Sequence, residues 1–301
     1  MSSYIEIKAH SLIKYQILRN YLGVCQRFED YYHNFAYIDT HGGSGQVLDL
    51  TDNSRKAGSV LTAAQIQPSF PCYAVEIDDL RFALLNDSAR TLKNVELHKG
   101  DCNELIHKIL LKIERGKRFV FCFIDPCGLV YQSDGKIADQ LRFETVEAVA
   151  GFPRSEILLN FPIEAIMQTS GVVHSMVADR QTVATMSDHL NKFFGSEDWH
   201  QVDPGDYRGF LKTYLECVKR VAPNYRYRGA ILIRSDEKNA PQYYLVYFSQ
   251  HIRGGKIMRD IMEKQWRDIT GAFPLTRHKY PTINEWREAE YPVEKPFIFE
   301  D

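Results

Sequence analysis

The sequence predicts an α/β fold in which helices cover both faces of a mainly parallel sheet. Short runs rich in Val, Ile, Phe and Tyr, bounded by Gly, Pro, Asp or Asn, alternate along the chain with longer amphipathic segments. The short runs predict strands at residues 35–38, 72–77, 94–98, 119–124, 156–161, 229–234 and 243–249. Helix-length segments separate the first five runs, and this alternation implies right-handed crossovers between parallel strands.

The helices follow from apolar side chains at three-to-four spacing. Residues 7–28 have this spacing and predict the first helix. Further helices are expected at 59–67, 79–91, 103–114, 144–150 and 256–269. The segment 163–228, between the fifth and sixth strands, is too long for a plain crossover, and its helical spacing predicts a helical insertion.

The last two strands differ from the first five. Only eight residues, SDEKNAPQ, join them, which is too few for a crossover helix and predicts an antiparallel hairpin. Five parallel strands and a late hairpin form the strand plan of the class I S-adenosylmethionine-dependent methyltransferases. We therefore expect a seven-stranded, Rossmann-like sheet of this class in a domain over 1–250, followed by a C-terminal helix and extended tail over 251–301. Such a fold does not by itself determine a function.

Composition excludes several classes of protein. Charged residues make up 25% and hydrophobic residues 44% of the 301 residues, which argues against disorder, a coiled coil or a collagen-like repeat. No run approaches the ~18–20 apolar residues of a membrane helix, and the N-terminus has no apolar signal core. The 6 cysteines form no C-x-x-C pair and the histidines have no ligand spacing, so we expect reduced thiols and no metal. The expected location is the cytoplasm.

Charge is distributed unevenly along the chain. Residues 201–280 contain 15 Lys and Arg against 8 Asp and Glu, whereas residues 281–301 contain 2 against 6. Aromatic side chains lie among the basic ones, namely Tyr207, Tyr214, Tyr225, Tyr227, Tyr243, Tyr244 and Trp266. The basic segment would suit phosphate contacts and base stacking, which favours a nucleic-acid substrate. The alternative is a solvated helical face with tyrosines in the core.

A glycine-rich loop follows the first predicted strand, in the sequence DTHGGSG from 39 to 45. Glycine lets the backbone approach a ligand and adopt positive φ angles. No further glycine completes a G-x-G-x-x-G pattern, and an acidic residue precedes the loop, which suits a cationic amino-acid end better than a pyrophosphate. The candidate cofactor residues here are Asp39, His41, Gly43, Ser44 and Gly45. A plain tight turn is the alternative.

Acidic residues also follow the second and third predicted strands. Glu76 can accept both hydroxyls of a ribose, and Asp101 can accept from an adenine amine while neighbouring backbone donates to the ring. Together with the glycine loop, they fit one adenosyl ligand that lies across the sheet edge. The cofactor-binding candidates therefore also include Ser59, Asp78, Cys102 and Asn103. The alternative is that the carboxylates cap the following helices.

The fourth predicted strand ends in the sequence IDPCG at 124–128. Enzymes that methylate an exocyclic amine place Asp or Asn before Pro at this point. The Asp125 carboxylate and the Pro126 carbonyl can accept from the amine and favour the pyramidal nitrogen that attacks, while proximity and orientation assist the transfer. After the fifth strand, Asn160 could orient a base and Phe161 could stack on it. Core packing is the alternative for Phe161.

The chain resembles the three-Cys-motif partner (TcmP) family of methyltransferases. The matching residues are KYQILRNYL at 14–22, YID at 37–39 with Gly43 and Gly45, GS at 58–59, IDP at 124–126 with Gly128, LNF at 159–161, FG at 194–195 with Trp199, YYLV at 243–246 and KIM at 256–258. The resemblance implies S-adenosylmethionine as cofactor and a three-cysteine, radical-SAM-like protein as partner.

The sequence departs from the TcmP pattern at two motifs. His41 and Gly42 replace Phe and Ala of the glycine loop, and Cys127 replaces the Phe of D-P-F-G. The D-P-F-G form is also similar to the motif of tRNA guanine dimethyltransferases, which makes the exocyclic amine of a nucleobase in RNA or DNA the expected target.

Three other functions compete with this hypothesis. Cys127 could be the nucleophile of a cytosine carbon-5 methyltransferase, although Asp125 nearby would raise its pKa. The protein could also be a non-catalytic scaffold that binds S-adenosylmethionine and its partner. A nicotinamide-dependent dehydrogenase is disfavoured by the missing third glycine and the Asp-Pro strand end.

Overall fold

The structure is a computed structural model, and it describes residues 5–7, 9–32, 34–66, 70–113, 118–133, 136–235 and 240–272. The expected extended tail falls on residues 273–301, outside this part of the chain, and stays a prediction. Within the described residues, no helix combines the length and apolar character needed to cross a membrane.

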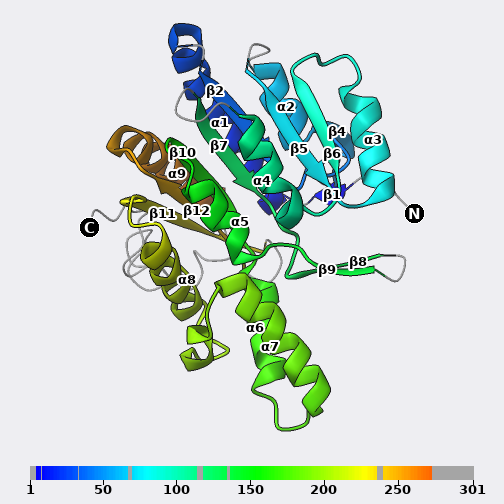
Figure 1. Cartoon of the computed structure of the whole chain (residues 1–301), viewed down its shortest axis with the longest axis vertical. Coiled ribbons are helices and arrows are strands. Elements are labelled where there is room, and N and C mark those ends of the chain that lie inside the picture. The colour runs from blue at the N-terminus through cyan, green and yellow to red at the C-terminus, as the bar shows by residue number, and fades with distance from the viewer. Residues whose placement is uncertain are drawn as a thin grey trace.

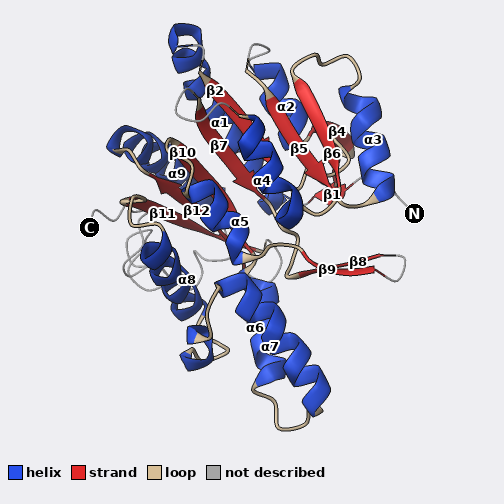
Figure 2. Ribbon diagram, in the orientation of Figure 1, coloured by secondary structure: helices blue, strands red, loops and turns tan. Residues whose placement is uncertain are grey.

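A seven-stranded sheet forms the centre of the molecule (Figures 1 and 2). Its spatial order is β11 (Tyr227–Arg234), β12 (Pro241–Ser249), β10 (Ser155–Phe161), β7 (Phe119–Ile124), β2 (Phe35–Asp39), β5 (Cys72–Glu76) and β6 (Val95–Lys99). Strands β10, β7, β2, β5 and β6 run parallel, and β12 pairs antiparallel with both β10 and β11. This topology confirms the predicted fold class, a Rossmann-like sheet with the class I methyltransferase strand plan.

The central strands are apolar without alternation because both faces of the sheet are covered. Every residue of β2, β5 and β10 is buried. On one face α1 (Ala9–Tyr32) packs against α2 (Ser59–Ile66) and α9 (Ile252–Ala272), while α4 (Cys102–Lys112) and α5 (Phe143–Ala150) cover the other (Figure 1). Helix α3 (Asp79–Ala89) packs against β5 and β6.

Register brings the carboxyl ends of three parallel strands to one level. Asp39 of β2 pairs with Ala74 of β5 and Phe123 of β7. Glu76 and Asp125 each follow two residues after these partners, so both reach the same edge of the sheet. The convergence of acidic residues is therefore a consequence of strand register.

Helices occupy the segment between β10 and β11, as the fold prediction expects. They are α6 (Ile163–Val173), α7 (Arg180–Phe194), the 3₁₀ turn η1 (Asp198–Gln201) and α8 (Tyr207–Val221). Figure 1 shows α6 and α7 as a pair that projects beyond the edge toward which the parallel strands point. Gly195 ends α7 with φ 65°, where a Cβ would collide with the ring of Phe143.

Two small sheets were not predicted. One contains β1 (Ile5–Ile7), β3 (Gln46–Asp49) and β4 (Ser54–Ala57), and the other is the hairpin of β8 (Val130–Ser133) and β9 (Lys136–Asp139). These strands are only three or four residues long, and β4 has the polar sequence SRKA. Runs this short and polar give no local strand signal.

The tyrosines of the basic segment are mostly part of the core. Tyr214, Tyr225, Tyr243 and Tyr244 are buried. Tyr207 and Tyr227 are half-buried, and the side chain of Trp266 lies outside the described part of the chain. The idea that these tyrosines form a base-stacking surface is therefore wrong for the four buried ones, which pack inside the protein.

Candidate functional site

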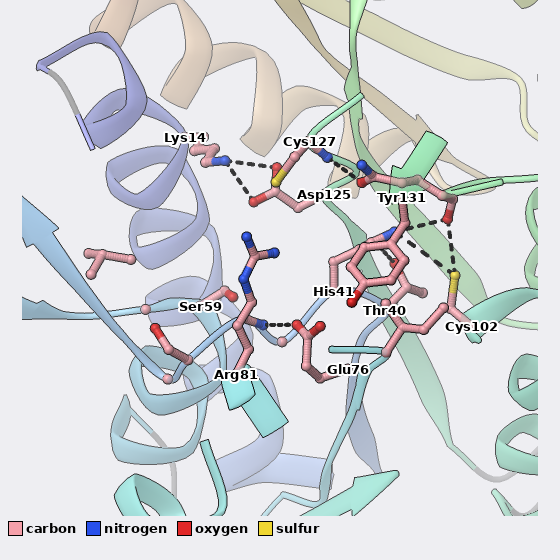
Figure 3. Close-up of a pocket in the computed structure, with 18 of the residues that line it drawn as sticks. Lys14, Thr40, His41, Ser59, Glu76, Arg81, Cys102, Asp125, Cys127 and Tyr131 are labelled. Atoms are coloured by element: carbon pink, nitrogen blue, oxygen red, sulfur yellow. Dashed lines mark hydrogen bonds and ion pairs between the residues drawn. The ribbon is translucent and has the colours of Figure 1, made fainter. Parts of the chain in front are cut away.

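A cavity opens at the carboxyl ends of β2, β5, β6 and β7 (Figure 3). Nine predicted site residues line it, namely His41, Gly43, Ser44, Gly45, Ser59, Glu76, Asp101, Cys102 and Asp125. Other predicted residues lie outside the lining, namely Asp39, Asp78, Asn103, Pro126, Asn160 and Phe161. Side chains that sequence reasoning missed complete the wall, namely Lys14 and Tyr15 of α1, Arg81 of α3, Tyr131 of β8 and Gln140 after β9.

The glycine loop adopts the left-handed backbone that its sequence allows. Gly43 and Gly45 have φ angles of 63° and 76°, which a residue with a side chain rarely adopts. The hairpin of β3 and β4 then returns the chain, and the Gly58 N–H donates to the Gly45 carbonyl at 2.8 Å. A Cβ on Gly58 would lie 2.9 Å from that carbonyl oxygen, so this close approach requires glycine. Helix α2 consequently begins beside the loop, with Ser59 on the cavity.

Asp39 lies behind the glycine loop and not on the cavity wall, which corrects its expected position. Its carboxylate is fully buried and accepts from the Tyr37 hydroxyl at 2.8 Å and from the His41 N–H at 3.1 Å. Burial raises the pKa of Asp39 to about 6, although hydrogen bonds from Ser59 and Tyr37 oppose the rise. Asp39 therefore stabilises the glycine loop from behind, on the side away from the cavity.

Glu76 stands at the end of β5 with its carboxylate toward the loop. Oε2 accepts from the Gly43 N–H and Oε1 from the Asp78 N–H, both at 2.8 Å. Burial raises the pKa of this carboxyl group. Each oxygen keeps a free acceptor position, because an ionised carboxylate offers about four. A diol could therefore bind here in bidentate fashion.

Two of the predicted cofactor residues cap helices. Asp78 caps α3 by accepting from the Arg81 N–H at 2.8 Å, and it accepts from the Tyr131 hydroxyl at 2.9 Å. Asp101 caps α4 in the same way through the Asn103 N–H and also lines the cavity. For Asp78 the capping alternative is the better description, whereas Asp101 combines both roles.

Asn103 has no free polar group to offer a ligand. Its amide Nδ2 donates to Asp101 at 2.8 Å and to the Asp139 carbonyl at 3.0 Å. Its Oδ1 accepts from the Arg142 N–H and the Thr145 hydroxyl, both at 2.8 Å. The expectation that the Asn103 side chain binds the cofactor is corrected, since one of its bonds holds the N-cap of α4 and the others join α4 to β9 and α5.

Asp125 is held by a lysine that the sequence analysis did not single out. The Lys14 ammonium lies 2.8 Å from Oδ1 and 2.7 Å from Oδ2, and the side chains are only 11% and 9% exposed (Figure 3). Burial alone would lower the pKa of Lys14, but Asp125 together with Tyr15, Tyr243 and Cys127 outweighs it and raises that pKa well above its ordinary range. The ammonium thus stays charged and keeps Asp125 an acceptor.

Asn160 supports Asp125 from behind. Its Nδ2 donates to Asp125 Oδ1 at 2.7 Å and to the Pro126 carbonyl at 3.3 Å. The predicted association of Asn160 with the Asp-Pro step is present, but the amide orients that step rather than a base in the cavity. Asp125 Oδ2 has Lys14 as its partner among the described residues, which leaves one acceptor position there for a ligand.

Phe161 belongs to the core. It is fully buried, with its ring centroid 5.1 Å from that of Tyr214 and 5.5 Å from that of Phe193. A stacking role on a substrate base is therefore wrong, and core packing is its function.

Cys127 lies at the acceptor side of the cavity next to Asp125. Its backbone N–H donates to the Gln140 side chain at 2.7 Å. Packing around the thiol, and secondly the charge of Asp125, raise its pKa. A thiol with a raised pKa is a poor nucleophile.

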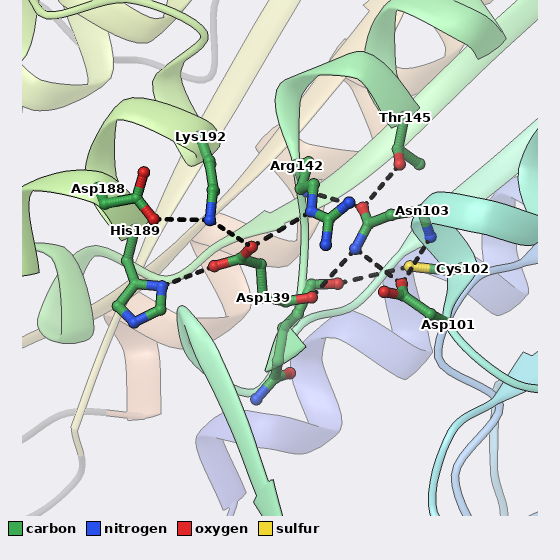
Figure 4. Close-up of polar contacts among 10 residues, drawn as sticks. Asp101, Cys102, Asn103, Asp139, Arg142, Thr145, Asp188, His189 and Lys192 are labelled. Carbon is green, nitrogen blue, oxygen red and sulfur yellow. Dashed lines mark hydrogen bonds and ion pairs between the residues drawn. The ribbon is translucent and has the colours of Figure 1, made fainter. Parts of the chain in front are cut away.

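Asp139 lines the cavity and connects it to the helical insertion (Figure 4). Asp139, 6% exposed, accepts from the His189 ring at 2.6 Å and pairs with Arg142 at 3.2 Å and Lys192 at 3.4 Å. Burial alone would raise the pKa of Asp139, but His189 and the cations outweigh it and lower that pKa. His189 and Lys192 belong to α7, so this junction fixes the insertion against the cavity wall.

Several solved structures are similar to this chain, and the first of them shares its fold. A protein of Legionella pneumophila in family-model DUF519 is similar with a TM-score of 0.51 and 10% identity, over 82% of this chain and 89% of that one. A Bacillus cereus O-methyltransferase in complex with SAH has a TM-score of 0.39 and 12% identity, over 77% and 80%. An rRNA methylase from Streptococcus thermophilus has a TM-score of 0.36 and 10% identity, over 77% and 93%. No family model and no curated protein matches the sequence.

Proposed function

We propose that this protein is an S-adenosylmethionine-dependent methyltransferase that acts on the exocyclic amine of a nucleobase. One observation supports this most strongly. A single cavity joins the glycine loop, Glu76 and Asp101 on one side to Asp125 on the other. A ligand that spans this cavity would meet carboxylates at one end and a buried hydrogen-bond acceptor at the other.

The cofactor-side residues match the chemistry of an adenosyl sulfonium ligand. Glu76 would accept the two ribose hydroxyls, and Asp101 would accept from the adenine amine. The glycine loop would receive the amino-acid end, with the buried Asp39 charge beneath it. When bound, S-adenosylmethionine supplies an electrophilic methyl group on a positively charged sulfur.

The acceptor side would orient an amine. Asp125 Oδ2 and the Pro126 carbonyl can accept hydrogen bonds from its two N–H groups, which favours a pyramidal nitrogen whose lone pair faces the methyl. Lys14 pairs with the carboxylate, and Asn160 keeps it in place. These residues contribute through proximity and orientation, and an ionised Asp125 can also receive the proton that the methylated amine releases.

The proposed partner and substrate are supported by the sequence. The TcmP resemblance supports a three-cysteine, radical-SAM-like partner, and the basic segment 201–280 supports a nucleic-acid substrate. Both belong to the proposal.

Methyl transfer can be measured directly. The pure protein should gain several degrees in melting temperature with S-adenosylhomocysteine, because a ligand bound by the folded state alone stabilises it. With methyl-labelled S-adenosylmethionine, we expect label in RNA or DNA and none in whole-cell protein, with the label on an exocyclic nitrogen. Thermal stabilisation without label in any of the three would favour the non-catalytic scaffold, and no stabilisation would contradict the proposal.

A cysteine-to-serine change separates the proposed enzyme from a cytosine carbon-5 methyltransferase. Cys127→Ser should keep methyl transfer within about threefold, because a thiol with a raised pKa is not the nucleophile. The measurement is kcat/KM with the substrate identified above. Loss of activity together with a stable covalent adduct between the parent protein and a fluorinated cytosine substrate would establish Cys127 as the nucleophile instead.

A further inference from the structure

Arg81 places an uncommitted positive charge in the cavity. It is the third residue of α3, and its backbone N–H is used by the Asp78 cap. Figure 3 shows its guanidinium extended into the cavity from the side of Glu76 toward that of Asp125 and Cys127. Its charge acts on both sides, because it opposes the rise in pKa of Glu76 and of the Cys127 thiol.

The carboxylates around Arg81 are engaged with other donors. Glu76 accepts from two backbone N–H groups, and Asp78 accepts from the Arg81 backbone and from Tyr131. Asp125 is paired with Lys14. Across the part of the chain that the structure describes, no side chain forms an ion pair or hydrogen bond with the Arg81 guanidinium. This charge is therefore available to a ligand.

We propose that Arg81 binds an anionic oxygen group of the ligand, and that this group is a phosphate of the nucleotide whose base reaches Asp125. The planar guanidinium has paired donors that match phosphate or carboxylate oxygens. Arg81 stands between the cofactor side and the acceptor side, where the phosphate of an inserted nucleotide would pass. The inference deepens the proposed function and rests on it.

The carboxylate of the cofactor is the other source of such an anion, and binding measurements distinguish the two. The variants are Arg81→Gln, which removes the charge, and Arg81→Lys, which keeps the charge but not the paired donors. Arg90→Gln is the matched control, because Arg90 follows the same helix, is 75% exposed and pairs with Asp87 on the surface. The probes are a mixed-sequence single-stranded RNA of about 20 nucleotides, titrated at several salt concentrations, and S-adenosylhomocysteine.

We expect Arg81→Gln to weaken RNA binding about tenfold or more and to lower the slope of log affinity against log salt by about 0.7, the value for one single-strand phosphate. Arg81→Lys should weaken binding less and keep the slope. Affinity for S-adenosylhomocysteine should change less than twofold in both variants. A tenfold loss of that affinity with unchanged RNA binding would assign Arg81 to the cofactor carboxylate and overturn the phosphate assignment.

Two further outcomes separate failure of this inference from failure of the proposed function. If Arg81→Gln equals Arg90→Gln in both assays while the parent protein binds S-adenosylhomocysteine, Arg81 binds no anion and the proposed function is untouched. If the parent protein binds RNA in an Arg81-dependent way but not S-adenosylhomocysteine, the phosphate assignment stands and the methyltransferase proposal fails. A parent protein that binds no RNA, with unchanged cofactor affinity in the variants, overturns the inference.

Discussion

Lys14→Met should destabilise the protein by about 3–5 kcal/mol, because it leaves the buried Asp125 carboxylate without its cation. The pair is almost completely removed from water, and Asn160 alone cannot neutralise the remaining charge. Chemical unfolding at pH 7.5, compared with the parent protein, measures the loss. Lys112→Met is the matched control, since its pair with Glu96 is largely exposed and its loss should leave the unfolding midpoint unchanged.

A double variant, in which the carboxylate of Asp125 is also removed, tests the same ion pair. Asp125→Asn in the Lys14→Met background should recover most of the lost stability, because no buried charge is left unpaired. Methyl transfer should fall in both proteins, because without Lys14 the Asp125 carboxylate is no longer held toward the amine, and Asn cannot receive the amine's proton. We expect kcat/KM to fall by about 10²-fold or more in both. Two results would contradict a charged Lys14–Asp125 pair. One is a Lys14→Met protein as stable as its parent, and the other is a double variant less stable than Lys14→Met.

The parts of the site that sequence predicts well are those that register dictates. Glu76 ends one buried parallel strand and Asp125 follows another, and such strands end at a common edge. A continuous apolar run such as Phe119–Ile124 is a strong local signal, so the position of Asp125 follows from it. The positions of Glu76 and Asp125 on the cavity wall can therefore be predicted from the local sequence.

The direction of side chains along a strand explains why the expected positions of Phe161 and Asp39 were wrong. Successive side chains of a strand point to opposite faces, so Asn160 and Phe161 cannot both face the Asp-Pro step. Asn160 takes that direction and Phe161 turns into the aromatic core. In β2, Tyr37 and Asp39 share one face, and the Tyr37 hydroxyl in the core bonds Asp39. Alternation alone could have indicated both outcomes.

Lys14 could not be found from local pattern. Within its helix it reads as a polar residue beside Ile13 and Ile17, and its partner Asp125 lies 111 residues away. The pairing of β1 with β3, which has no local signal, brings the start of α1 next to the glycine loop. Long-range pairing of this kind comes from tertiary structure, as does the junction of Asp139 with α7.

Asp39→Asn should change stability in a pH-dependent way. The pKa of Asp39 is about 6 in the folded protein, against about 3.9 in an unfolded chain. An acid with a raised folded pKa contributes stability below about pH 4 that is lost as the pH rises through 6, and two units correspond to about 3 kcal/mol. The free energy of unfolding of Asp39→Asn minus that of the parent should therefore rise by about 2 kcal/mol between pH 4 and pH 7, the remainder of the change lying below pH 4.

Chemical unfolding of both proteins across this range gives the difference directly, and groups common to both, such as Glu76, cancel. If the difference between the two free energies of unfolding did not change with pH, the Asp39 carboxyl group would not have a pKa raised by burial.

The cofactor proposal adds a comparison of two ligands. S-adenosylmethionine carries a sulfonium charge and S-adenosylhomocysteine does not, so only the first should stabilise the Asp39 carboxylate through that charge. The midpoint of the pH dependence should lie lower with S-adenosylmethionine, and equal midpoints would mean that the methionine end does not bind above Asp39.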